Sequence, residues 1–303
     1  MMSRSALLML VVLVASACGK PGSSGEYVKQ IEAWRAKHEA DYRKEYVGLA
    51  GLFFLKPGPN KAGSAAGNDV VLPPSAPGEV GTFLLDGANN VRFEPGAPGL
   101  VTLNGKSVDQ PIDLKSDAAK PGPDELTVGS VAMWVHPSGD RRAIRLRDEQ
   151  GEMARSFAGF HWFPIDPKYR IVAKFTKDTE PPRQVKVPTL TGDYATYTTE
   201  GTVEFQFEGQ TIHMRPMTTR PKRLFLIFRD GTSGHETYAA ARFLYADLND
   251  DGTTVLDFNE AYNPPCSFNA YTTCPLPPPE NRLSIRLPVG EKDYPNHPAH
   301  LTP

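Results

Sequence analysis

The sequence has few cysteines, no strong excess of either charge and only a short apolar run at its N-terminus. Its 303 residues contain three cysteines, and 33 Lys and Arg stand against 35 Asp and Glu, which gives a net charge of −2. This balance excludes a strongly basic nucleic-acid binder and leaves the chain without an acidic tail. The cysteines form no Cys-x-x-Cys motif, and Ser233 does not lie in the Gly-x-Ser-x-Gly elbow of many serine hydrolases. We therefore expect no nucleic-acid partner, no metal site and no cofactor.

Proline and glycine, in contrast, are abundant. The chain has 29 prolines and 26 glycines. These residues interrupt regular structure, because proline lacks an amide donor and fixes φ while glycine adopts turn conformations readily. Many short segments separated by turns predict a mainly β protein.

Residues 1–18 have the composition of a lipoprotein signal peptide. Arg4 supplies positive charge, residues 6–14 form an apolar segment too short to span a membrane, and the small residues 15–17 precede Cys18. This arrangement resembles the lipobox of bacterial lipoproteins, in which the cysteine is lipidated and becomes the mature N-terminus. The alternative is an ordinary secretory signal in which Cys18 is incidental.

Residues 19–25 are rich in glycine and serine and are expected to form a flexible tether after Cys18. Gly19 takes the place of the aspartate that is linked to inner-membrane retention. We therefore expect the protein in the cell envelope, lipid-anchored on the periplasmic face of the outer membrane if the cell has one.

Residues 26–47 are predicted to form a helix. Aromatic and apolar residues recur there at steps of three and four, with charged residues between them: Tyr27, Ile31, Trp34, His38 and Tyr42. A stripe of this period predicts an amphipathic helix that packs on the body of the protein.

Residues 48–156 are predicted to form a first β unit. Short apolar runs alternate with turn residues, and Asn104-Gly105 is a strong signal for a type I′ hairpin. The segments Gly63–Pro73 and Val101–Val108 resemble the opening and the paired strands of forkhead-associated domains, which implies a β-sandwich. Their phosphopeptide binding does not carry over, because Ser64 stands near the place of the expected arginine.

Residues 157–294 are predicted to form a second β unit, followed by a tail at 295–303. Leu224–Phe228 is apolar at every position, which predicts a buried strand. Glu208-Gly209 is a plausible hairpin turn. Asp247–Gly252 has the oxygen ligands that open a calcium loop but lacks the glutamate at step twelve, so a hairpin turn is the favoured interpretation.

The proline-rich loop 262–281 has neither helical nor strand period, yet its aromatic residues argue against disorder. We expect an ordered loop docked on β-structure and forming the functional surface. Cys266 and Cys274, eight residues apart, are predicted to form a disulfide or to pack as free thiols. A metal site or a catalytic cysteine is a weaker alternative, the latter needing a histidine brought beside it by the fold.

A polar cluster follows the buried strand and continues toward the loop. Prolines leave the loop carbonyls without local partners, so we expect arginine and tyrosine side chains from neighbouring strands to hold the loop. These side chains form either a structural hydrogen-bond network or a pocket beneath loop 262–281. The candidate residues are Arg229, Asp230, His235, Glu236, Tyr238, Arg242, Asp257, Asn259, Tyr262 and Asn263.

The second half of the chain resembles the family called domain of unknown function 1684. The resemblance is carried by Arg229–Tyr238, Arg242–Tyr245, Val255–Asn259, Ala261–Cys266 and Thr273–Leu283. It implies a bacterial or archaeal protein and provides no catalytic residue to transfer.

The sequence thus predicts a mainly β fold: an N-terminal helix, then a forkhead-associated-like β-sandwich or small barrel, then a second β unit. The expected function is that of a cell-envelope lipoprotein acting as a binding module for an unknown ligand. The alternative is a hydrolase-type enzyme with its polar pocket under loop 262–281. An enzyme needs several titratable groups converging in a closed pocket, whereas a binding module needs an aromatic or polar surface.

Overall fold

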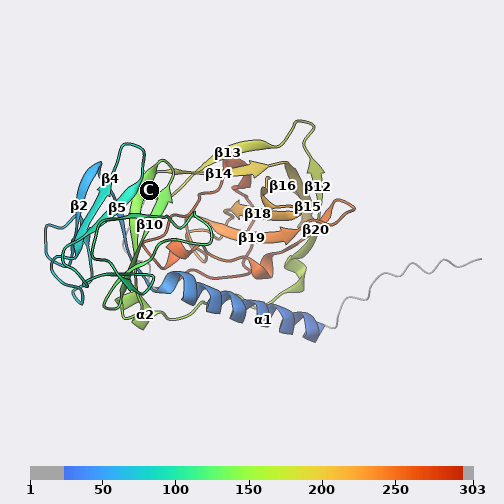
Figure 1. Ribbon diagram of the computed structural model, residues 1–303. Helices are drawn as coiled ribbons and strands as arrows, with labels where there is room; N and C mark the ends of the chain where they lie inside the picture. The colour runs from blue at the N-terminus through green and yellow to red at the C-terminus, as the bar shows by residue number, and fades with distance from the viewer. Residues whose placement is uncertain (1–23, 296–303) are drawn as a thin grey trace, which may run out of the picture.

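A computed structural model describes residues 24–295 and shows a mainly β protein with one long helix (Figure 1). The predicted fold class is confirmed at this level. The signal peptide, Cys18 and residues 19–23 of the predicted tether lie outside the described residues, as do residues 296–303. Within the described range, no helix combines the length and the hydrophobicity needed to cross a membrane.

The first half of the chain forms two sheets that enclose a common core. The six-stranded sheet has the order β1 (Leu49–Phe54), β11 (Arg141–Asp148), β10 (Val131–Ser138), β9 (Leu126–Val128), β6 (Thr102–Leu103) and β7 (Lys106–Ser107). The five-stranded sheet has the order β3 (Val70–Val71), β2 (Gly58–Gly63), β4 (Gly81–Leu85), β5 (Val91–Pro95) and β8 (Ile112–Leu114). Phe83 and Phe93 from one sheet and Met133 and Leu146 from the other are fully buried in this core. Two packed sheets agree with the predicted sandwich, whereas the closer likeness to forkhead-associated domains is not confirmed.

The predicted hairpin turns are present. Asn104 and Gly105 have φ values of 48° and 82° and join β6 to β7. Glu208 and Gly209 have φ values of 48° and 79° and join β15 (Gly201–Phe207) to β16 (Gln210–Met214). Positive φ at both central positions is what a type I′ turn requires.

The second half of the chain forms two further sheets. The four-stranded sheet has the order β16 (Gln210–Met214), β15 (Gly201–Phe207), β12 (Arg170–Lys177) and β20 (Thr253–Asp257). The five-stranded sheet has the order β13 (Arg183–Pro188), β14 (Tyr194–Thr199), β17 (Met217–Arg220), β18 (Arg223–Phe228) and β19 (Arg242–Asp247). The turn between β19 and β20 is held by backbone bonds from Asn249 to Thr253 and from Gly252 to Asn249. This arrangement agrees with the hairpin interpretation, and no group of metal-binding side chains occurs among residues 24–295.

Strand β18 explains the apolar run that the sequence contains. Leu224, Leu226 and Phe228 face the core between the two sheets of the second half. Phe225 and Ile227 face the opposite way and pack in a separate aromatic cluster. Because both faces of the strand are covered, every position is apolar, as predicted.

The long helix and several short helical segments complete the chain. They are α1 (Ser24–Tyr42), the π-turn η1 (Arg43–Val47), α2 (Glu152–Ser156), η2 (Pro167–Tyr169), η3 (Phe258–Glu260), η4 (Pro265–Ser267) and η5 (Pro279–Asn281). Helix α1 lies along the second half of the protein (Figure 1), and its Trp34 and His38 pack against Trp162 and Tyr262. Burial lowers the pKa of His38 to about 4, so this ring packs in its neutral form.

The two halves of the chain also contact each other through charged side chains. Arg141 of β11 donates from Nε to Asp193 Oδ1 at 2.8 Å, and Ser138 Oγ donates to Asp193 Oδ2 at 2.7 Å. The Arg141 guanidinium holds the pKa of Asp193 below its ordinary value. The edge of the first half is thereby fixed to the turn between β13 and β14.

Candidate functional site

The proline-rich loop 262–281 is ordered by buried asparagine side chains. Asn269 donates from Nδ2 to the carbonyls of Tyr46 and Leu49 at 3.0 and 2.9 Å, and its Oδ1 accepts from the Tyr271 amide. Asn269 is 1% exposed. One side-chain amide therefore satisfies backbone groups in three places, which is how irregular buried chain avoids unpaired polar groups.

Asn281 does the same at the other end of the loop. Its Nδ2 donates to the carbonyls of Arg215 and Ile227, both at 2.9 Å, and its Oδ1 accepts from the Arg215 amide at 2.7 Å. The expectation that arginine and tyrosine side chains hold the loop is met only in part. Tyr238 donates its hydroxyl to the Cys266 carbonyl at 3.4 Å, while the other anchors described here come from asparagines of the loop itself.

The candidate polar residues divide among several contact groups instead of lining one cavity. Arg242 is fully buried and donates from Nη1 to Asp230 Oδ2 at 2.7 Å and to the Leu287 carbonyl at 3.0 Å. It also donates from Nη2 to the Val289 carbonyl. The charge of the buried carboxylate is thus compensated, and the pair fixes the segment 285–289 against β19.

Asp257 and Asn259 belong to a second group, which holds helix α1. Tyr27 donates its hydroxyl to Asp257 at 2.8 Å, and Asn259 Nδ2 donates to the Tyr27 hydroxyl at 2.9 Å. Asn259 also bonds to the backbone of Asp166. Its Oδ1 accepts from the Asp166 amide, and its Nδ2 donates to the Asp166 carbonyl. Burial, followed by the bond to Asp257, raises the pKa of Tyr27 well above its ordinary value. These residues anchor the helix.

Asn263 belongs to a third group with a residue that the sequence analysis did not select. Its amide N and Nδ2 donate to the two carboxyl oxygens of Glu291 at 2.9 and 3.1 Å, and Nδ2 also donates to the Lys292 carbonyl. Burial raises the pKa of Glu291 to about 8. Glu291 follows the loop by ten residues and no local pattern marks it as a partner of Asn263.

Three of the remaining candidates lie outside these three contact groups. Glu236 forms a partly exposed ion pair with Arg286, and His235 is exposed. Arg229 joins the end of the loop through backbone bonds, its amide to the Asn281 carbonyl and its carbonyl to the Leu283 amide. The set therefore acts largely as the structural network that was one of its two predicted roles.

The cysteines of the loop are both buried and free in the structure. They lie against each other, with the Cys266 amide donating to Cys274 Sγ at 3.4 Å. The packed thiols agree with one of the two predicted states, and oxidation to a disulfide stays a prediction.

A cavity of about 290 Å³ lies directly under the loop, with mostly aromatic walls. The loop supplies Tyr262, Pro265 and the stretch Thr272–Pro275, and the remaining walls come from helix α1, the π-turn η1 and the strands of both halves. These other lining residues are Tyr42, Tyr46, Arg145, Tyr197, Phe225, Phe243 and Tyr245. A pocket under the loop was expected, but of the ten candidates only Tyr262 lines it.

Arg145, on strand β11 of the first half, lines this tyrosine-lined pocket. Its side chain is 13% exposed, and its Nη2 donates to His136 Nε2 at 3.0 Å. His136 Nδ1 in turn contacts Asp117 Oδ2 at 2.7 Å, and Arg145 Nη1 lies 3.8 Å from the same oxygen. Among the described residues, no hydrogen-bond partner is present for the buried Nε of Arg145.

The charges behind Arg145 are arranged to keep it fixed. Burial alone would raise the pKa of Asp117, but the bond from His136 and the charge of Arg145 outweigh it and leave the pKa below its ordinary value. Asp117 is therefore an anion, His136 donates to it through Nδ1–H, and the His136 Nε2 lone pair accepts from Arg145. His136 and Asp117 thus hold the guanidinium on one side.

The tyrosines of the pocket are neutral hydrogen-bonding groups. Burial raises the pKa of Tyr46 and of Tyr197 to about 12. Burial also raises the pKa of Tyr42 and Tyr262 well above the ordinary value. Phe225 and Tyr245 stack with their ring centroids 4.6 Å apart, which makes a flat apolar wall.

The sequence did not predict Arg145 and its aromatic surroundings as a site. It shows only on which face of a strand or helix each of these residues lies. In Ile144–Arg147, core residues alternate with arginines, so period two places Arg145 opposite the sandwich core. Tyr42 and Tyr46 are four residues apart and share a side of the helical chain. Neither pattern shows that the two segments meet at the same cavity.

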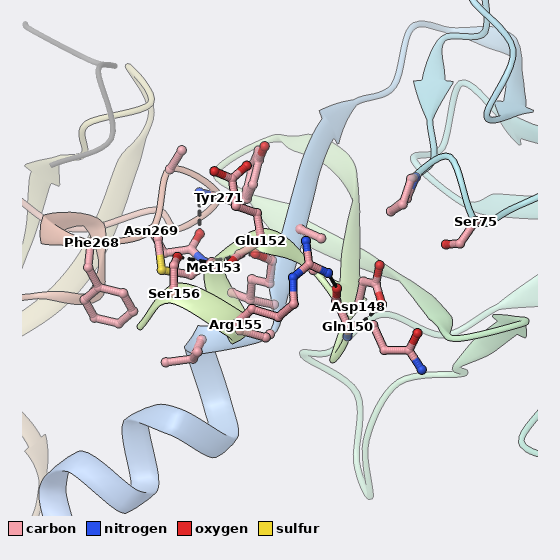
Figure 2. Close-up of a pocket in the computed structure, with 18 of the residues that line it drawn as sticks. Ser75, Asp148, Gln150, Glu152, Met153, Arg155, Ser156, Phe268, Asn269 and Tyr271 are labelled. Atoms are coloured by element: carbon pink, nitrogen blue, oxygen red, sulfur yellow. Dashed lines mark hydrogen bonds between the residues drawn. The ribbon is translucent and has the colours of Figure 1, made fainter. Parts of the chain in front are cut away.

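A second hollow, of about 730 Å³, lies between the turn after β11, helix α2 and residues 268–271 of the loop (Figure 2). Its polar groups are largely used within its own walls. Arg155 donates to the Gln150 carbonyl, Ser156 to the Glu152 carbonyl, and Asn269 is committed to the backbone as described above. We therefore take the tyrosine-lined pocket as the candidate site.

The structural role of the buried pair predicts unequal effects of two arginine substitutions. Arg242→Gln leaves Asp230 buried without its cation, so the free energy of unfolding should fall by about 3–5 kcal/mol in urea titrations. The matched control, Arg286→Gln, breaks a partly exposed pair and should cost no more than about 1 kcal/mol. Equal losses in the two variants would contradict the assignment of Arg242 to the protein's framework.

Comparisons with known proteins bear on the second half of the chain. The family described as protein of unknown function (DUF1684) matches residues 155–292. An uncharacterized protein of Haloarcula marismortui, solved by solution NMR, is 32% identical over 46% of this chain and 80% of its own, with a TM-score of 0.39. The search of curated proteins gave no match. On the strength of the family match over residues 155–292, the chain belongs to the DUF1684 family of proteins of unknown function.

Proposed function

We propose that the protein is a lipid-anchored binding protein of the cell envelope and that the tyrosine-lined pocket is its binding site. We further propose that the ligand is a small organic anion with a flat apolar body. The pocket's volume of about 290 Å³ lies just below the range for drug-sized small-molecule sites, about 300–1,000 Å³. Its size therefore suits a ligand of one ring or a short chain.

The observation that carries the proposal is Arg145 in an aromatic surround. A guanidinium presents several N–H donors in a planar fork that matches carboxylate and phosphate groups. His136 and Asp117 occupy one side of it, while Nε has no partner among the described residues. The Arg145 side chain lines the pocket, so an anionic group bound there would lie beside its positive charge.

The rings supply the rest of the recognition. Aromatic walls favour a flat apolar body, and protonated tyrosine hydroxyls can donate to its polar edges. The predicted hydrolase alternative relied on Arg229–Tyr238 and Asp257–Cys274. Most of those polar side chains brace the helix and the C-terminal segment, so we favour binding over hydrolysis.

The envelope location rests on the first 25 residues. A short apolar segment, small residues before Cys18 and a glycine- and serine-rich stretch after it are the pattern of a cleaved, lipidated and tethered N-terminus. A lipid on Cys18 would place the binding pocket at the membrane surface.

Substituting Cys18→Ala should remove the lipid and release the protein from the membrane fraction or block its processing. Fractionation and intact-mass measurement of the purified protein check this outcome. Cys274→Ala, which removes another cysteine of the same chain, should leave the protein in the membrane fraction. A wild-type protein that is soluble and carries no lipid would overturn the anchor.

Calorimetric titration with benzoate, using benzyl alcohol as a neutral probe of the same shape, tests the pocket. The wild type should bind benzoate more tightly than the alcohol. Arg145→Gln should weaken benzoate binding about tenfold or more, because a hydrogen bond to a charged group is worth about 1.5–3 kcal/mol. Benzyl alcohol binding should change little.

Two controls accompany this titration. Arg92→Gln removes an exposed arginine of the first half and should leave benzoate binding unchanged. Arg145→Lys keeps the positive charge and should retain part of the preference for benzoate. Equal binding of benzoate and benzyl alcohol by the wild type contradicts the proposed ligand class.

A further inference from the structure

The cysteine Cys274 forms part of the wall of the tyrosine-lined pocket. Cys274 lines the cavity together with Thr272 and Arg145, although its side chain is almost fully buried. Its sulfur accepts a hydrogen bond from the Cys266 amide at 3.4 Å and lies 3.7 Å from the Thr272 hydroxyl. The Thr272 hydroxyl donates to the Asn269 carbonyl, so the Cys266 amide is the donor directed at the sulfur, and a donor at this position favours a sulfur that carries negative charge.

The second cysteine stands behind the first. Its backbone amide donates to Cys274 Sγ, and Cys266 is not among the residues that line the cavity. The short helical turn Pro265–Ser267 holds Cys266, and the hydroxyl of Tyr238 contacts its carbonyl. Cys274 therefore lines the pocket, whereas Cys266 lies outside its lining.

The surroundings distinguish the two sulfurs electrostatically. Burial, and then the contact with Cys274, raise the pKa of the Cys266 thiol well above its ordinary value. Burial also acts on Cys274, but the hydrogen bonds with Cys266 and the charge of Arg145 oppose it and lower its pKa. The thiolate, which is the nucleophilic form, is thus favoured at the sulfur on the pocket side.

We propose that Cys274 and Cys266 form a reactive dithiol that exchanges with small anionic disulfides entering the tyrosine-lined pocket, with Cys274 attacking and Cys266 resolving. The inference rests on the proposed binding pocket and names a substrate class for it. Arg145 supplies the selectivity for a negative group, and the aromatic walls hold the remainder of the molecule.

The exchange balances in two steps. The Cys274 thiolate attacks one sulfur of the disulfide, a Cys274–sulfur bond forms, the substrate's sulfur–sulfur bond breaks, and one thiolate leaves. Cys266 then loses its proton to the departing thiolate and attacks the Cys274 sulfur, which releases the second thiolate. The protein is oxidised by two electrons to the Cys266–Cys274 disulfide, and the substrate is reduced to two thiols.

Intact-mass analysis tests this sequence in the full chain carrying Cys18→Ala, so that Cys266 and Cys274 are the only thiols. The anionic probe is dithiodipropionate, and the neutral and cationic probes are hydroxyethyl disulfide and cystamine. With dithiodipropionate, the protein should lose both thiols without retaining an adduct. Cys266→Ser should instead accumulate one mixed disulfide on Cys274, and Cys274→Ser should react far more slowly.

The dependence of the reaction rate on the charge of the probe distinguishes this proposal from non-selective thiol reactivity. Dithiodipropionate should react about tenfold faster than cystamine, because two opposite charges at contact distance in a partly buried site differ by more than 1 kcal/mol from two like charges. Arg145→Gln should abolish that preference. Melting curves of each variant confirm that the reacting protein is folded.

The outcomes separate the two proposals. Equal rates for Cys266→Ser and Cys274→Ser, or a folded wild type that keeps both thiols, overturn the dithiol even if benzoate binds. Exchange through Cys274 without charge preference and without benzoate binding supports a reactive dithiol but removes the anion site. Exchange with the expected preference supports both.

Discussion

The structure depends on four buried asparagine side chains that pair the backbone where regular strands end. Asn259, Asn263, Asn269 and Asn281 are at most 1% exposed, and each bonds to main-chain groups of distant segments. Their surroundings are rich in proline, which gives up amide donors and resists both helix and strand. A primary amide offers two donors and an acceptor on a short side chain, so it can replace the backbone hydrogen bonds that a neighbouring strand would supply. Without these amides the segments packed against them would bury unpaired carbonyls at a cost of several kcal/mol.

Fixing the loop has a consequence for the space beneath it. The loop is tied to strand β13 by the bond from the Leu276 amide to the Pro188 carbonyl, and to the first half of the chain through Asn269. A wall held from both sides keeps the cavity open instead of collapsing onto the rings. Arg145 reaches the cavity from the first half, so both halves of the chain are needed to complete it.

Much of the regular structure was predictable because it depends on neighbours in the sequence. The period of helix α1, the fully apolar strand β18 and the Asn104-Gly105 turn each follow from a few adjacent residues. The loop was also recognisable as an ordered feature, from its aromatic residues among prolines. These predictions needed no knowledge of which segments meet.

The site was less predictable because its contacts join distant residues. Asparagine near proline is an ordinary turn residue, and nothing local shows that Asn281 bonds to Ile227. Arg242 and Asp230 attracted attention as polar residues after a buried strand, yet their charges cancel inside the protein's framework. Arg145 gave no such signal, since alternating arginines are common on an exposed strand face. Polar residues in the sequence thus identified the side chains that hold the loop more clearly than the side chains that line the pocket.

The central claim is that a pocket held open by the asparagine-braced loop presents Arg145 to an anion. The most direct measurement is the NMR signal of the Arg145 Nε–H group, assigned with the Arg145→Lys variant and followed during titration with benzoate. The account predicts that this signal shifts progressively and saturates, while the Nε–H signal of exposed Arg92 stays in place. A saturating response elsewhere in the protein, with the Arg145 signal unchanged, would contradict the account.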